Sequence, residues 1–90
     1  MNYIVYNAII ECVEEMGYIV FEKGEADFNI GNYITDSIIF IEYIIKLESR
    51  FEIELPEDFL TYDILYSAKV FSEKLTCYLI SEGKVVASGE

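Results

Sequence analysis

The sequence predicts an all-α protein, a small bundle of three main helices and one short helix, with a long loop between the first two helices. Apolar residues recur at intervals of three and four in three separate segments, the pattern of amphipathic helices. The single proline follows the second segment, where it would stop a helix. The short run over residues 18–21 could pass for a strand, but the chain offers it no convincing partner.

Length and composition allow one domain. A chain of 90 residues buries roughly 60 to 70% of its unfolded surface, so one modest core is feasible without disulfides or metals. Hydrophobic residues make up 53% and charged residues 26%, which is typical of globular proteins. We expect the domain to cover residues 1–82 and a frayed tail to cover residues 83–90.

The first helix is predicted over residues 2–16 and ends at Gly17. Its apolar face comprises Tyr3, Tyr6, Ile9, Ile10, Val13 and Met16. Residues 17–35 contain three glycines and no sustained period, which indicates a long loop. We expect Phe21, Phe28 and Ile30 to tuck this loop partly into the core.

The second helix is predicted over residues 36–50, with Asp36 or Thr35 as its cap and Phe51 tucked under its end. Pro56 then interrupts helical structure. Thr61 can cap a short turn over residues 62–66, and Ser67 can cap a last helix that runs to about Ile80. The inward residues expected on the last helix are Val70, Phe71, Leu75, Tyr78, Leu79 and the stem of Lys74.

The second helix carries two apolar faces. At 3.6 residues per turn one continuous stripe is formed by Phe40, Tyr43, Ile44, Leu47 and Phe51, and it predicts the core face. Ile38, Ile41 and Ile45 fall on nearly the opposite side, next to Glu42 and Glu48. Two interpretations stay open: the loop covers this second stripe with Ile34 or Phe28, or the stripe is a docking surface rimmed with carboxylates.

Charge limits the partners. Six basic and seventeen acidic residues give a net charge of −11, which repels nucleic-acid phosphates and anionic lipid. We therefore expect no nucleic acid and no membrane as partner, and a protein with a basic patch instead. We also expect the chain to be monomeric.

Localisation in the cytoplasm is predicted from the N-terminus, which lacks a basic region typical of signal peptides. The longest apolar segment is interrupted by Asp36, Glu42 and Lys46, so no membrane span is expected. Cys12 and Cys77 are interpreted as small hydrophobic residues, and with no histidine in the chain we expect no metal site.

Ser37 raises the question of function. A nucleophilic serine needs a base, yet the chain has no histidine and no Lys or Arg within a turn of Ser37, so we expect no enzyme and no catalytic residue. A calcium loop starting at Asp27 fails, because Gly31 stands where an oxygen ligand belongs and Ile38 stands where the bidentate glutamate belongs. The role left for Ser37 is that of a modified residue. It is predicted at the start of a helix, where free N–H groups and the helix dipole favour an attached phosphate.

Asp-Ser alone is typical of any helix cap, so the surrounding pattern carries the interpretation. The segment "DSIIFIEYIIKLESRFEIELPEDF" resembles the centre of acyl and peptidyl carrier proteins, which bind phosphopantetheine. That family places Asp-Ser-Leu or Asp-Ser-Ile before a hydrophobic helix, a Glu five residues after the Ser, and then Glu-x-x-Phe-x-Ile-x-Ile/Leu-Pro. The matching positions are Asp36, Ser37, Ile38, Glu42, Glu48, Phe51, Ile53, Leu55 and Pro56.

The resemblance implies that Ser37 receives a 4′-phosphopantetheine arm from coenzyme A, attached by a separate phosphopantetheinyl transferase. The arm would carry an acyl or aminoacyl group as a thioester between a loading enzyme and downstream biosynthetic enzymes. The resemblance also implies a recognition face for these enzymes, formed by Ile38, Ile41, Glu42, Ile45 and Glu48.

The chain departs from fatty-acid-synthesis carriers at two positions. Ile39 stands where those carriers usually have an acidic residue, and Ile34 stands where they have a small one. The segment "GNYITDSI" is more similar to freestanding carriers for amino-acid loading or specialised biosynthesis. The alternative is an arm-free helical module that binds a basic partner through the second helix. The aromatic-rich core predicts short or polar cargo.

Overall fold

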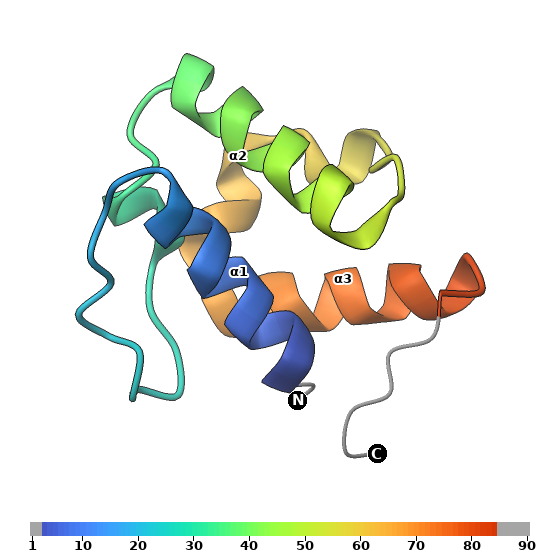
Figure 1. Ribbon diagram of the computed structural model, residues 1–90, viewed down its shortest axis with the longest axis horizontal. Coiled ribbons are helices and arrows are strands. Elements are labelled where there is room, and N and C mark those ends of the chain that lie inside the picture. Colours follow the sequence, from blue (N-terminus) through green and yellow to red (C-terminus); the bar gives the residue numbers. More distant parts are fainter. Residues whose placement is uncertain (1–2, 85–90) are drawn as a thin grey trace.

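The computed structural model describes residues 3–84, and these residues form three α-helices joined by loops and short 3-10 turns (Figure 1). The α-helices are α1 (Tyr3–Glu15), α2 (Ser37–Phe51) and α3 (Ala68–Ser81). The 3-10 turns are η1 (Ile30–Asn32), η2 (Glu57–Phe59) and η3 (Tyr62–Tyr66). No strand occurs within residues 3–84, so the predicted all-α bundle of three main helices is confirmed.

Helix α1 is the central packing element, since it contacts both α2 and α3. Figure 1 shows α1 crossing in front of α3, with α2 at the top of the view. Ile9 and Val13 are completely buried, as their four-residue spacing predicts, and Val5, which was not predicted, is completely buried as well. Tyr3 was expected on the same face but is exposed. Asn2, where we expected the helix to begin, lies outside the described residues.

Helix α2 begins and ends one residue later than expected. Its side chains Phe40, Tyr43, Ile44 and Leu47 are buried. The hydroxyl of Tyr43 donates a hydrogen bond to the carbonyl of Ile9 at 3.1 Å, which ties α2 to α1 inside the core. Glu52 ends the helix in the left-handed conformation, with φ of 57°, and its N–H bonds to the carbonyl of Glu48. Phe51 is half-buried, in line with the prediction.

The long loop enters the core, but not at all of the predicted residues. Phe28 and Ile30 are buried as expected, but the expectation for Phe21 is wrong, because its side chain is 83% exposed. Val20 turns inward, and its neighbours Ile19 and Phe21 both point to solvent.

The segment between α2 and α3 is built from 3-10 turns. Pro56 precedes η2 in extended conformation, so it marks the predicted break. The turn expected over residues 62–66 is the 3-10 helix η3. Thr61 makes no capping hydrogen bond through its side chain, contrary to the prediction. Neither η1 nor η2 was predicted, because three-residue turns leave no periodic signal.

Helix α3 starts as predicted, with the Ser67 hydroxyl accepting the N–H of Val70 at 3.1 Å. Phe71, Leu75 and Leu79 are completely buried, while Lys74 is exposed and places its Nζ 5.7 Å from the centre of the Phe59 ring.

A frayed tail was expected over residues 83–90. Gly83 and Lys84 hydrogen bond back to α3, through Ile80 at 3.0 Å and Leu79 at 2.9 Å. Residues 85–90 lie outside the described residues.

Asp27 fastens the long loop to the start of α3. Its carboxylate accepts hydrogen bonds from the N–H of Phe28 at 2.8 Å, the hydroxyl of Ser67 at 2.7 Å and the N–H of Lys69 at 2.9 Å. Beside it, the N–H of Ala68 donates to the carbonyl of Phe28 at 2.8 Å. Partial burial by itself would raise the pKa of Asp27, but the hydrogen bonds outweigh it, and the pKa is lowered from its ordinary 3.8.

We expect Asp27→Asn to lower the free energy of unfolding by about 1 to 2 kcal/mol near pH 7, because the negative charge and one of the two acceptor oxygens are lost at a solvent-exposed site. A folded-state pKa below the unfolded one contributes stability that is present above 3.8 and is lost as pH falls through the folded value. The difference between wild type and Asp27→Asn should therefore shrink in acid. Urea unfolding at about pH 7 and about pH 3 measures it, with Asp63→Asn as an exposed control, and an unchanged difference contradicts the assignment.

Candidate functional site

Ser37 is the first residue of α2 and is exposed to solvent. Asp36 caps the helix, because its carboxylate accepts the N–H of Ile39 at 2.9 Å and its carbonyl accepts the N–H of Phe40 at 2.9 Å. Of the two predicted caps, the structure selects Asp36. At such a start the N–H groups of Ser37 and Ile38 have no acceptor within the helix, so they face outward together with the positive end of the helix dipole.

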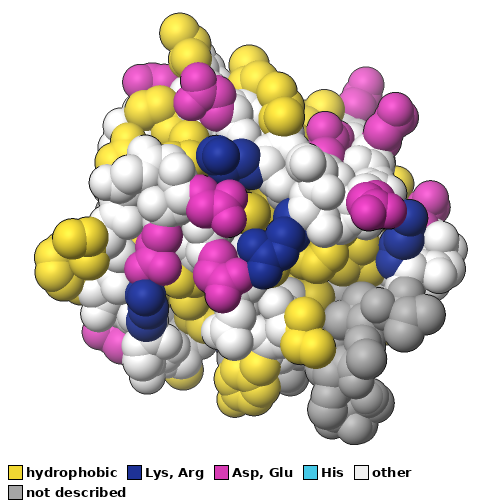
Figure 2. All heavy atoms as spheres, viewed as in Figure 1, with side chains coloured by type: hydrophobic (Ala, Val, Ile, Leu, Met, Phe, Trp, Pro, Cys, Tyr) yellow, Lys and Arg dark blue, Asp and Glu magenta, His cyan; other side chains and the backbone are white. Residues whose placement is uncertain are grey.

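The second stripe of α2 is uncovered. Ile38 is 70% exposed, and Ile41 and Ile45 are each 56% exposed. Of the two interpretations left open, covering by the loop is wrong, because Phe28 and Ile34 are themselves buried in the core. In Figure 2 hydrophobic side chains protrude at the upper edge of the molecule, where α2 begins.

A groove of about 530 Å³ opens beside Ser37. Phe40 and Ile44 are the buried members of its lining, and Ile41, Ile45 and Leu60 are the exposed ones. Leu60 lies between η2 and η3 and forms the wall opposite α2, which sequence reasoning did not anticipate. No periodicity places Leu60 near Ser37, so only the tertiary structure reveals this contact.

The two flanks of α2 differ in charge. Lys46 lies 3.9 Å from a carboxylate oxygen of Glu15, and Arg50 hydrogen bonds to the carboxylate of Glu11. The hydrogen bond to Glu11 raises the pKa of Arg50 above its ordinary value. Figure 2 shows basic side chains surrounded by acidic ones on this face. Both cations of α2 therefore lie against α1. The acidic side chains on the opposite flank of α2 are not neutralised by them, so that flank is negatively charged.

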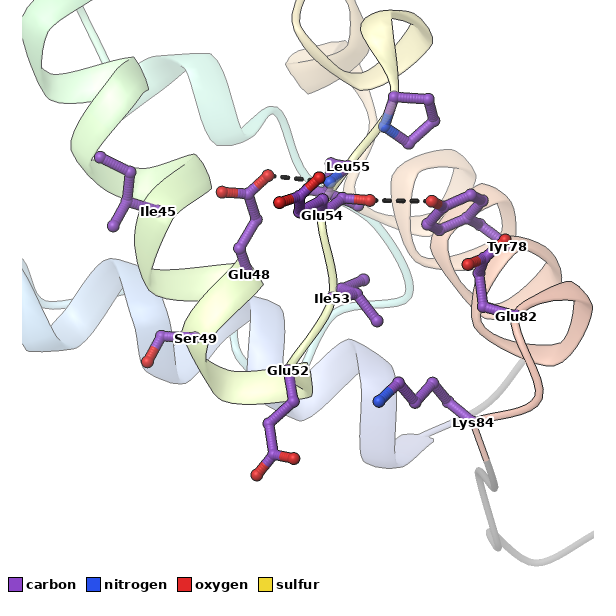
Figure 3. Close-up of a pocket in the computed structure, with 11 residues that line it drawn as sticks. Ile45, Glu48, Ser49, Glu52, Ile53, Glu54, Leu55, Tyr78, Glu82 and Lys84 are labelled. Carbon is purple, nitrogen blue, oxygen red and sulfur yellow. Dashed lines mark hydrogen bonds between the residues drawn. The ribbon is translucent and has the colours of Figure 1, made fainter.

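Glu48 has a structural contact that the prediction missed. One of its carboxylate oxygens accepts the N–H of Leu55 at 2.8 Å (Figure 3), and its carbonyl accepts the N–H of Ile53 at 3.1 Å. Glu48 is half-buried, whereas Glu42 is exposed. Glu48 thus holds the chain segment after α2 in place, in addition to lying on the predicted recognition face. Sequence reasoning gave no indication of this contact.

The remaining polar chemistry is sparse. Burial raises the pKa of the Cys12 thiol to about 11, so it is protonated near neutral pH. Cys77 is exposed. Within residues 3–84 no group of three or more His, Cys, Asp or Glu side chains is arranged to hold a metal ion. None of the helices in this range is long and apolar enough to cross a membrane.

Comparisons with known proteins add no relative. No family model, no curated protein and no solved structure matches the chain.

Proposed function

We propose that this chain is a carrier protein that bears 4′-phosphopantetheine on Ser37 and shuttles thioester-bound acyl or aminoacyl intermediates between biosynthetic enzymes. The observation that supports this most directly is an exposed serine at the first position of α2, next to three exposed isoleucines on the same helix. In this role the chain is not an enzyme, and a phosphopantetheinyl transferase modifies it.

The residues around Ser37 fit such an arm. A phosphate on an exposed hydroxyl at a helix start is favoured by the outward N–H groups and by the dipole. The groove beside Ser37 offers apolar side chains from both α2 and Leu60, along which the arm or its cargo would lie. When bound, the group would supply a thiol that holds the cargo as a thioester.

The neighbouring surface fits enzymes that act on the arm. Ile38, Ile41 and Ile45 would contact apolar residues of a partner, and Glu42 would meet its basic rim.

The predicted preference for short or polar cargo has support from the core, where the Phe71 ring contacts Tyr43 and Phe59 at centroid distances of 6.3 and 6.0 Å. Packed rings leave little room for a long chain. Specialised biosynthesis or amino-acid loading therefore remains the favoured pathway class.

The test is intact-protein mass spectrometry of the purified chain after incubation with coenzyme A and a broad-specificity phosphopantetheinyl transferase. We expect a gain of one phosphopantetheine. A folded chain that gains nothing would contradict the proposal and favour the arm-free module that binds a basic partner through α2.

A further inference from the structure

We infer that the chain has a second docking surface, at the far end of α2 from Ser37, that binds a basic amphipathic helix of a partner protein. This surface is a groove of about 890 Å³ between the last turns of α2, residues 52–56 and the end of α3 (Figure 3). We call it the distal groove. The inference does not depend on whether Ser37 carries an arm.

The floor of the distal groove is apolar and held in place. Ile45, Ile53, Leu55 and Tyr78 contribute side chains to it. The N–H of Leu55 bonds to Glu48, and the hydroxyl of Tyr78 donates to the carbonyl of Glu54 at 2.8 Å. These two bonds fix residues 53–55 against both helices (Figure 3). A partner would therefore meet a formed surface and would not have to order it first.

The rim is acidic. Glu48, Glu52, Glu54 and Glu82 line the groove, and Lys84 is the only cation among the described residues that line it. Figure 3 shows that the carboxylates come from three segments, α2, the loop after it and the end of α3, arranged around Ile53. Because Lys46 and Arg50 lean towards α1, they do not offset this charge. An apolar floor within an acidic rim is complementary to a helix with apolar residues on one side and Lys or Arg beside them.

Other macromolecular occupants are disfavoured by charge. A second copy of the chain has the same net charge of −11 and would place carboxylates against carboxylates. Nucleic acid and anionic lipid meet the same repulsion. A volume of about 890 Å³ lies in the range of pockets for drug-sized molecules, so the distal groove admits several side chains at once.

The distal groove also adjoins the surface near Ser37. Ile45 and Glu48 line both grooves, so the two form one continuous surface along α2. A partner helix in the distal groove could therefore belong to the same protein that contacts Ile38 and Ile41. Such a contact would add binding energy at a distance from Ser37 without covering it.

The test is an NMR titration of the ¹⁵N-labelled chain with a synthetic amphipathic peptide of about 15 residues, long enough to form a helix, with Leu on one side and Lys on the other. We expect the largest shift changes at the amides of Ile53, Leu55 and Tyr78. Shift changes spread evenly over the acidic surface, or centred on Ile38 and Ile41, would overturn the inference. The titration does not involve Ser37 chemistry, so a failure here is distinct from a failure of the carrier proposal.

Matched variants separate local recognition from net charge. The groove variant carries Glu52→Gln, Glu54→Gln and Glu82→Gln, and the control variant carries Glu25→Gln, Asp63→Asn and Glu73→Gln. Both remove three negative charges from exposed positions, and Glu48 is spared because it holds Leu55. We expect the groove variant to weaken peptide binding about tenfold and the control about twofold at low salt. Equal weakening of the two variants, or no weakening of either, would overturn the inference.

Discussion

Ser37→Ala should abolish attachment of phosphopantetheine completely and leave the fold intact. In the proposed function the Ser37 hydroxyl is the group to which phosphopantetheine is attached. No other residue of the segment that matches the carrier pattern takes this position. The side chain is exposed at the first position of α2, so its loss should change the free energy of unfolding by no more than about 0.5 kcal/mol. Asp36 keeps its hydrogen bond to the N–H of Ile39 in this variant, and the cap therefore survives.

Intact-protein mass spectrometry with coenzyme A and a transferase measures the first effect, and thermal unfolding followed by circular dichroism measures the second. Ser49→Ala is the matched control, because Ser49 is an exposed serine of the same helix. We expect Ser49→Ala to accept one arm at the wild-type rate. A Ser37→Ala chain that still gains the arm would show that the site lies elsewhere.

Phe71→Ala should have the largest effect on stability. Its ring is completely buried and contacts the rings of Tyr43 and Phe59. Removing a buried phenyl ring leaves a cavity and costs about 3 to 5 kcal/mol, which is a large part of the total stability of a small domain, about 5 to 15 kcal/mol. We therefore expect Phe71→Ala to be unfolded or nearly so at room temperature.

Phe21→Ala is the matched control for this prediction. It removes the same ring from a side chain that is 83% exposed, so the cost should be within about 0.5 kcal/mol. If Phe71→Ala does not fold, Phe71→Leu gives a measurable intermediate, and its urea midpoint should still lie below that of Phe21→Ala. Comparable losses at the two positions would show that the long loop packs differently.

The helices were predictable because their signals are local. The three-and-four spacing of α1 and the stripe of Phe40, Tyr43, Ile44 and Leu47 lie within single helices. Caps at Asp36 and Ser67 were predictable for the same reason, since each bonds to an N–H three residues ahead. The Asp-Ser pair at the start of α2 and the two separate apolar stripes of this helix were predictable in the same way, because each is a pattern within a single helix.

Contacts across the chain were not predictable in this way. The carboxylate of Asp27 reaches Ser67 and Lys69, forty and forty-two residues away, and no pattern in the sequence relates them. Phe21 was expected to enter the core, but Val20 is buried there and the side chain of Phe21 is exposed.

The sequence by itself determined where helices form to within a residue or so, which side of each is apolar, and that Ser37 lies near the start of the helix with a spare apolar stripe. Tertiary structure alone decided that this stripe stays uncovered, that Leu60 faces α2 across the groove beside Ser37, and that Glu48 holds Leu55. The physical reason is one of range. Helical periodicity and capping are satisfied within a few residues, whereas burial and a groove depend on which distant segments pack together.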